Sequence, residues 1–174
     1  LACQSAVKSF LEKEVDKIIV TRPAVSADED LGFLPGTLEE KMAPWTRPIF
    51  DVLREYFYAN EIESMIREGV IEISPLAYMR GRTFKSAFII ADEMQNATPN
   101  QMKMLLTRIG SDSKMVVTGD LAQADRIKDN GLIDFITQLK QKDTNYIDVC
   151  NFKQSDIERH EAVKEVLEIY GDIA

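Results

Sequence analysis

The chain has 174 residues, of which 45% are hydrophobic and 29% are charged, as expected for one globular domain with a sizeable core. It shows no signal peptide and no apolar run of the roughly 20 residues that a membrane-spanning helix needs, so we expect a cytoplasmic protein outside the membrane. One histidine and two distant cysteines argue against a zinc site or a His-based triad. The net charge of -8 argues against a surface built for nucleic acid, although a few clustered Lys and Arg could still form a local groove.

The hydrophobic pattern predicts helices that alternate with strands. We expect helices over 1–14, 49–59, 62–68, 98–109, 132–140 and 156–170, and strands over 17–21, 70–74, 87–92, 114–118 and 146–150. The acidic segment 24–48, with several Pro and Gly residues, is typical of loops and short helices. This order favours right-handed crossovers and a mostly parallel sheet with helices on both faces. No repeat or linker interrupts the pattern, so we predict a three-layer α/β fold in a single domain, 1–174.

The predicted strand 87–92 ends in two adjacent carboxylates, Asp92 and Glu93. Its apolar run, Phe88–Ala91, is typical of a strand buried on both faces. Two acids at its end would be costly to desolvate unless a cation or a nucleophilic water lay beside them. One interpretation is a Walker B site, in which the first acid supports Mg²⁺ and the Glu polarises the attacking water. The other is an ordinary strand end with acidic residues before a helix.

A second polar cluster, Thr118, Asp120 and Gln123, follows the predicted strand 114–118. Ligands bind beyond the carboxyl ends of the strands in open α/β sheets, so this cluster should share an edge with the two acids. A Gln there can hydrogen-bond a γ-phosphate or its attacking water. A Gly-Asp turn with a capping Asp is the plainer explanation of the cluster alone, but two successive polar strand ends favour a nucleotide site.

A series of motifs then follows in order along almost the whole chain. They are Val20–Val25, Leu31–Gly36, Ser74–Phe84, Ile90–Asn96, Leu106–Gly110, Thr118–Gln123 and Asp156–His160. Together they resemble the PhoH-like family of ATPases. The resemblance implies a P-loop NTPase with a RecA-like core similar to that of superfamily 1 helicases. Such proteins occur in bacteria and phages, and some are fused to PIN ribonuclease domains and act on RNA.

The resemblance also implies roles for both polar clusters. Asp92 matches the Walker B acid that supports Mg²⁺, through water, and Glu93 matches the catalytic Glu. Gln123, with Asp120, matches a Gly-Asp-x-x-Gln sensor of the γ-phosphate, and Thr118 lies in the same nucleotide-binding motif.

Several arginines are further candidates. Arg159 resembles an arginine finger, whose fixed charge would offset charge developing on the γ-phosphoryl group; the alternative is a surface Arg on a first helical turn. Arg80 and Arg82 could contact phosphate or form an ion-pair network around the two acids. Arg108 is expected to brace the fold. Arg22 matches a motif near the nucleic-acid path of helicases, or it caps a helix.

The sequence departs from the family pattern at its start. The Walker A loop, Gly-x-x-x-x-Gly-Lys-Thr, and the strand before it do not occur. That strand would be internal in a RecA-like sheet, beside 114–118, and its loss would leave backbone groups unpaired. We therefore expect the native protein to carry both upstream of Leu1, and we expect these 174 residues alone to bind ATP weakly and to hydrolyse it poorly.

The leading expectation is Mg²⁺-dependent ATP hydrolysis coupled to work on RNA or other single-stranded nucleic acid, in a homo-oligomer such as a hexameric ring. The alternative is a nucleotide-gated protein-interaction or stress-response module without nucleic-acid activity, which the acidic charge slightly favours. A relic that kept only the fold is a third reading, against which the intact acids and Gln123 argue. The aromatic group does not decide between them, since it could stack bases but more readily packs helices; its members are Trp45, Phe50, Tyr56, Phe57 and Tyr58.

Overall fold

The computed structural model describes residues 1–23, 47–124, 129–153, 156, 158 and 160–170. They fall into two compact units, Leu1–Gln141 and Lys142–Ala174. Predicted elements within 24–46, and Arg159, lie outside the described residues. No helix in the described ranges is long and apolar enough to span a membrane.

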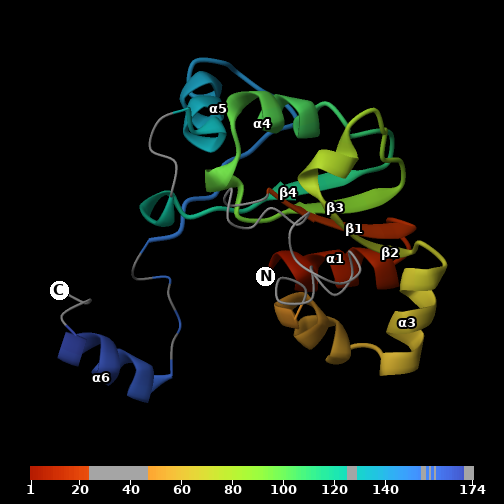
Figure 1. The fold of residues 1–174 in the computed structure, drawn as a ribbon. Coiled ribbons are helices and arrows are strands. Elements are labelled where there is room, and N and C mark those ends of the chain that lie inside the picture. The colour runs from red at the N-terminus through yellow and green to blue at the C-terminus, as the bar shows by residue number, and fades with distance from the viewer. Residues whose placement is uncertain (24–46, 125–128, 154–155, 157, 159, 171–174) are drawn as a thin grey trace, which may run out of the picture. The chain divides into compact units, whose positions relative to one another are not determined.

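The first unit is built on a parallel sheet of four strands in the order β2-β1-β3-β4 (Figure 1). The strands are β1 (Lys17–Arg22), β2 (Ile71–Pro75), β3 (Ala87–Ala91) and β4 (Lys114–Val117). The helices α1 (Ala2–Leu11) and α3 (Ala59–Arg67) lie on one face, and α4 (Pro99–Leu106) and α5 (Gly131–Leu139) on the other. Residues 47–54 form a further helix, and short 3₁₀ helices are η2 (Leu76–Met79), η3 (Met94–Asn96) and η4 (Leu121–Gln123). The predicted three-layer α/β fold is confirmed.

The central strand β3 belongs to both hydrophobic cores. All five of its residues are buried, as its unbroken apolar run predicts. Because side chains alternate along a strand, Phe88 and Ile90 enter the core beneath α1 and α3, whereas Ile89 and Ala91 enter the core beneath α4 and α5. The strand is thereby fixed on both faces, and so is the point at which it ends.

The register of the sheet aligns three strand ends. Ala91, the last residue of β3, pairs with Thr21 of β1 and with Val117 of β4. The residues that follow, Arg22, Asp92 and Thr118, therefore emerge at one edge of the sheet.

Helix α4 begins as predicted but ends early. Thr98 accepts a hydrogen bond from the Gln101 backbone N–H, and the Gln101 side chain accepts one from the Thr98 N–H, which makes a capping box. The helix ends at Leu106, whereas the sequence predicted about Ile109. Tertiary pairing overrides the helical pattern there, because Ile109 forms a parallel bridge with Phe84.

The strand predicted over 146–150 is wrong, since none of its residues is in a strand. Tyr146 is 98% exposed, and Ile147 and Val149 are also exposed. An alternating apolar pattern becomes a strand only when a neighbouring strand accepts its hydrogen bonds, and no described strand pairs with this segment.

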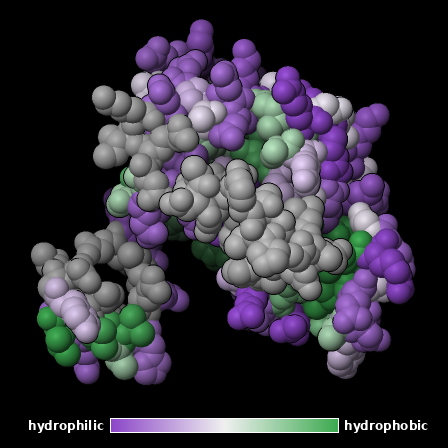
Figure 2. Space-filling view, in the orientation of Figure 1, coloured by the Kyte–Doolittle hydropathy of each residue, from purple (hydrophilic) through white to green (hydrophobic). Residues whose placement is uncertain are grey.

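The helix predicted over 156–170 is shorter in the structure. It is α6 (Glu161–Tyr170), which begins five residues later than expected. Hydrophobic residues gather on part of this helix in Figure 2. Val166 and Ile169 on α6 are exposed.

Candidate functional site

The ends of β3 and β4 meet through a direct side-chain contact. The Thr118 hydroxyl donates a hydrogen bond to Oδ1 of Asp92 at 2.5 Å, and both side chains are half-buried. Backbone bonds fix the two ends, since the Thr118 N–H donates to the carbonyl of Ala91 and the Asp92 N–H to that of Thr21. The Asp92 carboxylate is therefore oriented by the neighbouring strand.

Glu93 occupies the turn that follows. Its backbone is left-handed, with φ 54° and ψ 34°, a conformation that costs a residue with a Cβ about 1–2 kcal/mol. Its Oε2 accepts a hydrogen bond from Nε2 of Gln95 at 2.6 Å. The turn thus places the half-buried Glu93 carboxylate directly after Asp92 in the chain, and Gln95 in the same turn fixes one of the Glu93 oxygens by a hydrogen bond.

Gln95 reaches from this turn to the loop after β4. Its side chain is 1% exposed, and its Oε1 accepts a hydrogen bond from the Asp120 N–H at 3.2 Å. Its carbonyl accepts another from Nδ2 of Asn130, at the start of α5, at 2.7 Å. A Cβ on Gly119 would lie only 2.9 Å from the Gln95 Oε1, so a glycine is needed where the loop passes the amide.

The remaining residues of the second cluster lie on the surface of the same loop. Asp120 and Gln123 are both exposed. Oδ1 of Asp120 caps η4 through the Ala122 N–H, and its Oδ2 accepts a hydrogen bond from Nε2 of Gln123 at 2.9 Å. The Gln123 amide is thus hydrogen-bonded to Asp120 and makes no hydrogen bond with Glu93.

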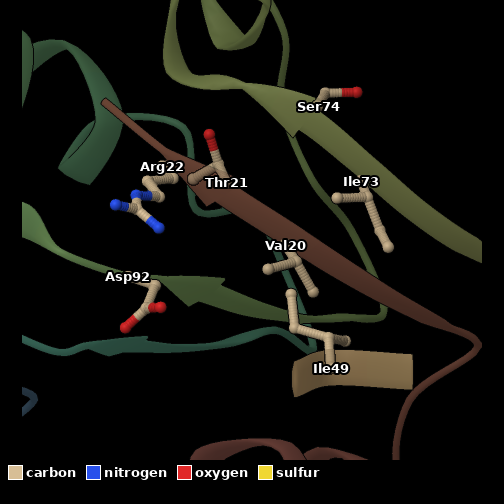
Figure 3. A pocket seen from close by; sticks show the side chains of 7 residues that line it. All are labelled: Val20, Thr21, Arg22, Ile49, Ile73, Ser74 and Asp92. Carbon is tan, nitrogen blue, oxygen red and sulfur yellow. The ribbon is translucent and has the colours of Figure 1, made fainter. Parts of the chain in front are cut away.

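A small cavity lies behind the edge, between β1, β2 and the helix 47–54 (Figure 3). Its volume of about 20 Å³ suits one water molecule and is far too small for a nucleotide. Arg22 and Asp92 lie on the same side of β1 in Figure 3, and the Thr21 hydroxyl points to the other side. That hydroxyl oxygen is buried and has no hydrogen-bond partner among the described residues.

The predicted arginines take different positions. Arg82 forms a bidentate ion pair with Glu72 of β2, with Nη2 and Oε2 at 2.7 Å, and its guanidinium lies 4.7 Å from the centre of the Phe84 ring. One of the two predicted alternatives was an ion-pair network of this arginine with Asp92 and Glu93. In the structure Arg82 pairs with Glu72 instead. Its hydrogen bonds lower the pKa of the Glu72 carboxyl below its ordinary value.

Arg80 is exposed, and its contact with phosphate stays a prediction. Arg108 was expected to brace the fold. It donates to the carbonyls of Met104 and Arg82 and so ties α4 to the loop before β3.

Comparison with known proteins decides the family. The family model described as "PhoH-like protein" matches residues 1–171. A PhoH-like protein of Synechocystis is 46% identical over 98% of the chain and 52% of its own length, and one of Bacillus subtilis is 47% identical over 98% and 53%. The Escherichia coli K12 protein PhoH is 41% identical over 98% and 49%. The chain belongs to the PhoH-like family. It spans about half the length of these curated relatives.

For a PhoH-like chain, Mg²⁺ is the implied metal, and the residues present fit it. The described residues hold no group of three or more His, Cys, Asp and Glu side chains that could bind a metal. Mg²⁺ needs no such cage, because it keeps several waters and takes one or two carboxylates. Asp92 and the Thr118 hydroxyl supply hard oxygen donors, hydrogen-bonded to each other, at the C-terminal edge of the sheet.

The structure brings four of the predicted site residues to one edge of this PhoH-like chain: Asp92, Glu93, Thr118 and Asp120. It adds Gln95 and Asn130, which sequence reasoning did not select. The available signal was a pair of polar residues, Gln95 and Asn96, directly after Met94 in the turn that follows the acids. Asn130 belongs to none of the motifs, and its partner Gln95 is 35 residues away in sequence, so only the fold reveals their contact.

Proposed function

We propose that the PhoH-like chain binds ATP with Mg²⁺ and hydrolyses it at the C-terminal edge of its sheet. The observation that carries the proposal is the hydrogen bond from Thr118 to Asp92 across two strand ends, beside the half-buried Glu93. Family membership supports it, since the same residues match the nucleotide-site motifs of PhoH-like ATPases.

Each residue at the edge has a part in the proposed reaction. Asp92 and Thr118 would hold the magnesium, which when bound offsets negative charge on the phosphate oxygens. Glu93 would accept a proton from the attacking water while the water oxygen bonds to the γ-phosphorus and the bond to the bridging oxygen breaks, so that the electron pair leaves with ADP. Oε1 of Glu93 accepts no hydrogen bond from the described residues, and a water could donate to it.

The loop that follows β4 would bind the γ-phosphate and respond to its presence. Gln123 lies on the same loop as Asp120 and would exchange its hydrogen bond with that carboxylate for one with the phosphate or the attacking water. The predicted arginine finger, Arg159, would offset charge on the γ-phosphoryl group from a neighbouring copy of the chain.

Binding and turnover of the full-length protein test this function. We expect Mg²⁺-dependent ATP hydrolysis, and Asp92→Asn should lower kcat by about 100-fold or more because it removes the charge that supports the metal. Asp134→Asn, at an exposed carboxylate on α5, is the matched control and should leave kcat unchanged. Hydrolysis that does not require Mg²⁺, or that survives Asp92→Asn, would refute the assignment.

The finer proposal is that hydrolysis is coupled to RNA or another single-stranded nucleic acid in a homo-oligomer. Arg22 favours it, because it leaves the sheet at the same edge as Asp92 (Figure 3). Single-stranded RNA should then stimulate ATP turnover, and Arg22→Ala should reduce the stimulation. A nucleotide-gated protein-interaction module is the alternative, which the net charge of -8 favours. Such a module should hydrolyse ATP at the same rate with and without RNA.

A further inference from the structure

A single buried amide joins the two halves of the proposed site. Nε2 of Gln95 donates to Oε2 of Glu93 at 2.6 Å, and Oε1 of the same amide accepts from the Asp120 N–H at 3.2 Å. A carboxylate can only accept and a backbone N–H can only donate, so just one orientation of the amide satisfies both partners. The position of the Glu93 carboxylate is thereby tied to the loop after β4.

Packing leaves this amide little freedom. The Gln95 side chain is 1% exposed, and the loop passes so close that a Cβ on Gly119 would lie 2.9 Å from its Oε1 and 2.7 Å from Cδ2 of Leu132. Any displacement of the loop would therefore press on the amide or break its hydrogen bond. A polar side chain buried at this depth is costly unless both ends are bonded, as they are here.

The backbone of Gln95 is held from a third direction. Nδ2 of Asn130 donates to the Gln95 carbonyl at 2.7 Å, and Oδ1 of Asn130 accepts from the N–H groups of Leu132 and Ile133, which caps α5. The Gly131 N–H also donates to the carbonyl of Ala97 at 2.7 Å. With the Gln95 backbone fixed to α5, the side-chain amide is the part of this residue that links the loop to Glu93.

We propose that Gln95 is a positioning residue that holds Glu93 in its hydrolytic orientation and makes that orientation depend on the loop 118–123. A phosphate bound by Gln123 would then set the position of Glu93 through Asp120 and Gln95. This inference rests on the proposed function, because it takes Glu93 as the group that receives the proton from water.

The test is Gln95→Met in the full-length protein, which keeps the side-chain volume and removes both hydrogen bonds. We expect kcat for ATP to fall by about 10- to 100-fold, the effect of a misplaced reacting group, while the Kd for ATP stays within about twofold. Gln101→Met is the matched control, because it also removes an amide that accepts from a backbone N–H, in the capping box of α4. It should leave kcat unchanged.

A double-mutant cycle separates positioning from general support of the fold. In a Glu93→Gln background, Gln95→Met should lower kcat no further, since its effect passes through Glu93. An equal further loss in that background would show that Gln95 acts elsewhere and would overturn the inference.

A second variant guards against misfolding of Gln95→Met. Gln95→Leu also removes both hydrogen bonds and adds no charge to the buried site, and it should lose as much kcat. Wild-type kcat in either folded variant overturns the inference and leaves the proposed function standing. No ATP turnover by the wild-type protein would overturn both.

Discussion

At Gly119, in the loop after β4, even one added carbon atom would disturb the site. An added Cβ would meet Leu132, Oε1 of Gln95 and the Gln95 backbone nitrogen, at 2.7, 2.9 and 3.1 Å. One of these contacts comes from α5 and two come from the turn after β3. An alanine here would therefore displace the Leu132 and Gln95 side chains or the loop itself.

Gly119→Ala should lower the free energy of unfolding by about 1–3 kcal/mol, the usual cost of overpacking a filled site. It should also lower ATP turnover, because the displaced amide would release Glu93. Urea unfolding and steady-state kinetics of the same preparation measure the two effects. Gly69→Ala is the comparison: the space around Gly69 is open and its φ is +71°, so the change should cost about 1 kcal/mol of stability and no turnover.

The positions of some site residues could be predicted from the sequence, and the contacts of others could not. The roles expected of Asp92, Glu93 and Thr118 depend on which residue types follow buried strands, and the sequence displays this directly. The bridge through Gln95 depends on a loop 25 residues away, and no local pattern encodes that distance. The same holds for the Arg82 ion pair, whose partner Glu72 is 10 residues away on β2.

At the scale of elements, the capping box fixes where α4 begins. Thr98→Ala removes the acceptor for the Gln101 N–H and should cost about 1 kcal/mol of stability. Thr98→Ser keeps the hydroxyl and should cost much less. Chemical denaturation of both variants measures the difference, and equal losses would show that the methyl group, and not the cap, matters.

The ion pair between Glu72 and Arg82 ties β2 to the loop that follows η2. Because the pKa of Glu72 is lowered in the folded state, the carboxylate stabilises the fold at neutral pH, and this contribution is lost as the pH falls below its ordinary value of 4.5 and through the lowered one. Glu72→Gln should therefore destabilise the protein at pH 7 by about 0.5–1 kcal/mol, since the pair is partly exposed.

Unfolding measured from pH 7 down to pH 3 checks this prediction. The difference between wild type and Glu72→Gln should shrink with acid. Glu63→Gln, at an exposed carboxylate on α3, is the control and should change stability little at any pH. A difference that stays constant with pH would show that shape, and not charge, supports this loop.

Element types were easier to predict than element ends. The apolar run of β3 and the Thr-Pro start of α4 are strong local signals, and both elements form. The end of α4 is set by the bridge from Ile109 to Phe84, which is a tertiary contact. The segment 146–150 has a strand-like pattern, but a pattern cannot supply the neighbouring strand that would accept its hydrogen bonds.

At the scale of the whole molecule, the parallel sheet brings motifs that are separate in the sequence together at one site. Strands that run in one direction and share a register deliver their C-terminal residues to one edge, so Asp92 meets Thr118 although 26 positions separate them. The alternation of helices and strands was sufficient to predict this sheet and its shared edge. The strand order was not deduced from composition or spacing, because it depends on which faces pack best against the helices.

The most direct test of the central claim is single-turnover hydrolysis of ATP by the full-length protein and its Glu93→Gln variant, with ATP affinity measured on both. We predict an ATP affinity that changes by less than about threefold and a hydrolysis rate that falls by about 10²- to 10⁴-fold, the range for loss of a general base. Glu63→Gln should hydrolyse ATP like the wild type. A Glu93→Gln variant that cleaves bound ATP at the wild-type rate would contradict the assignment of this edge as the hydrolytic centre.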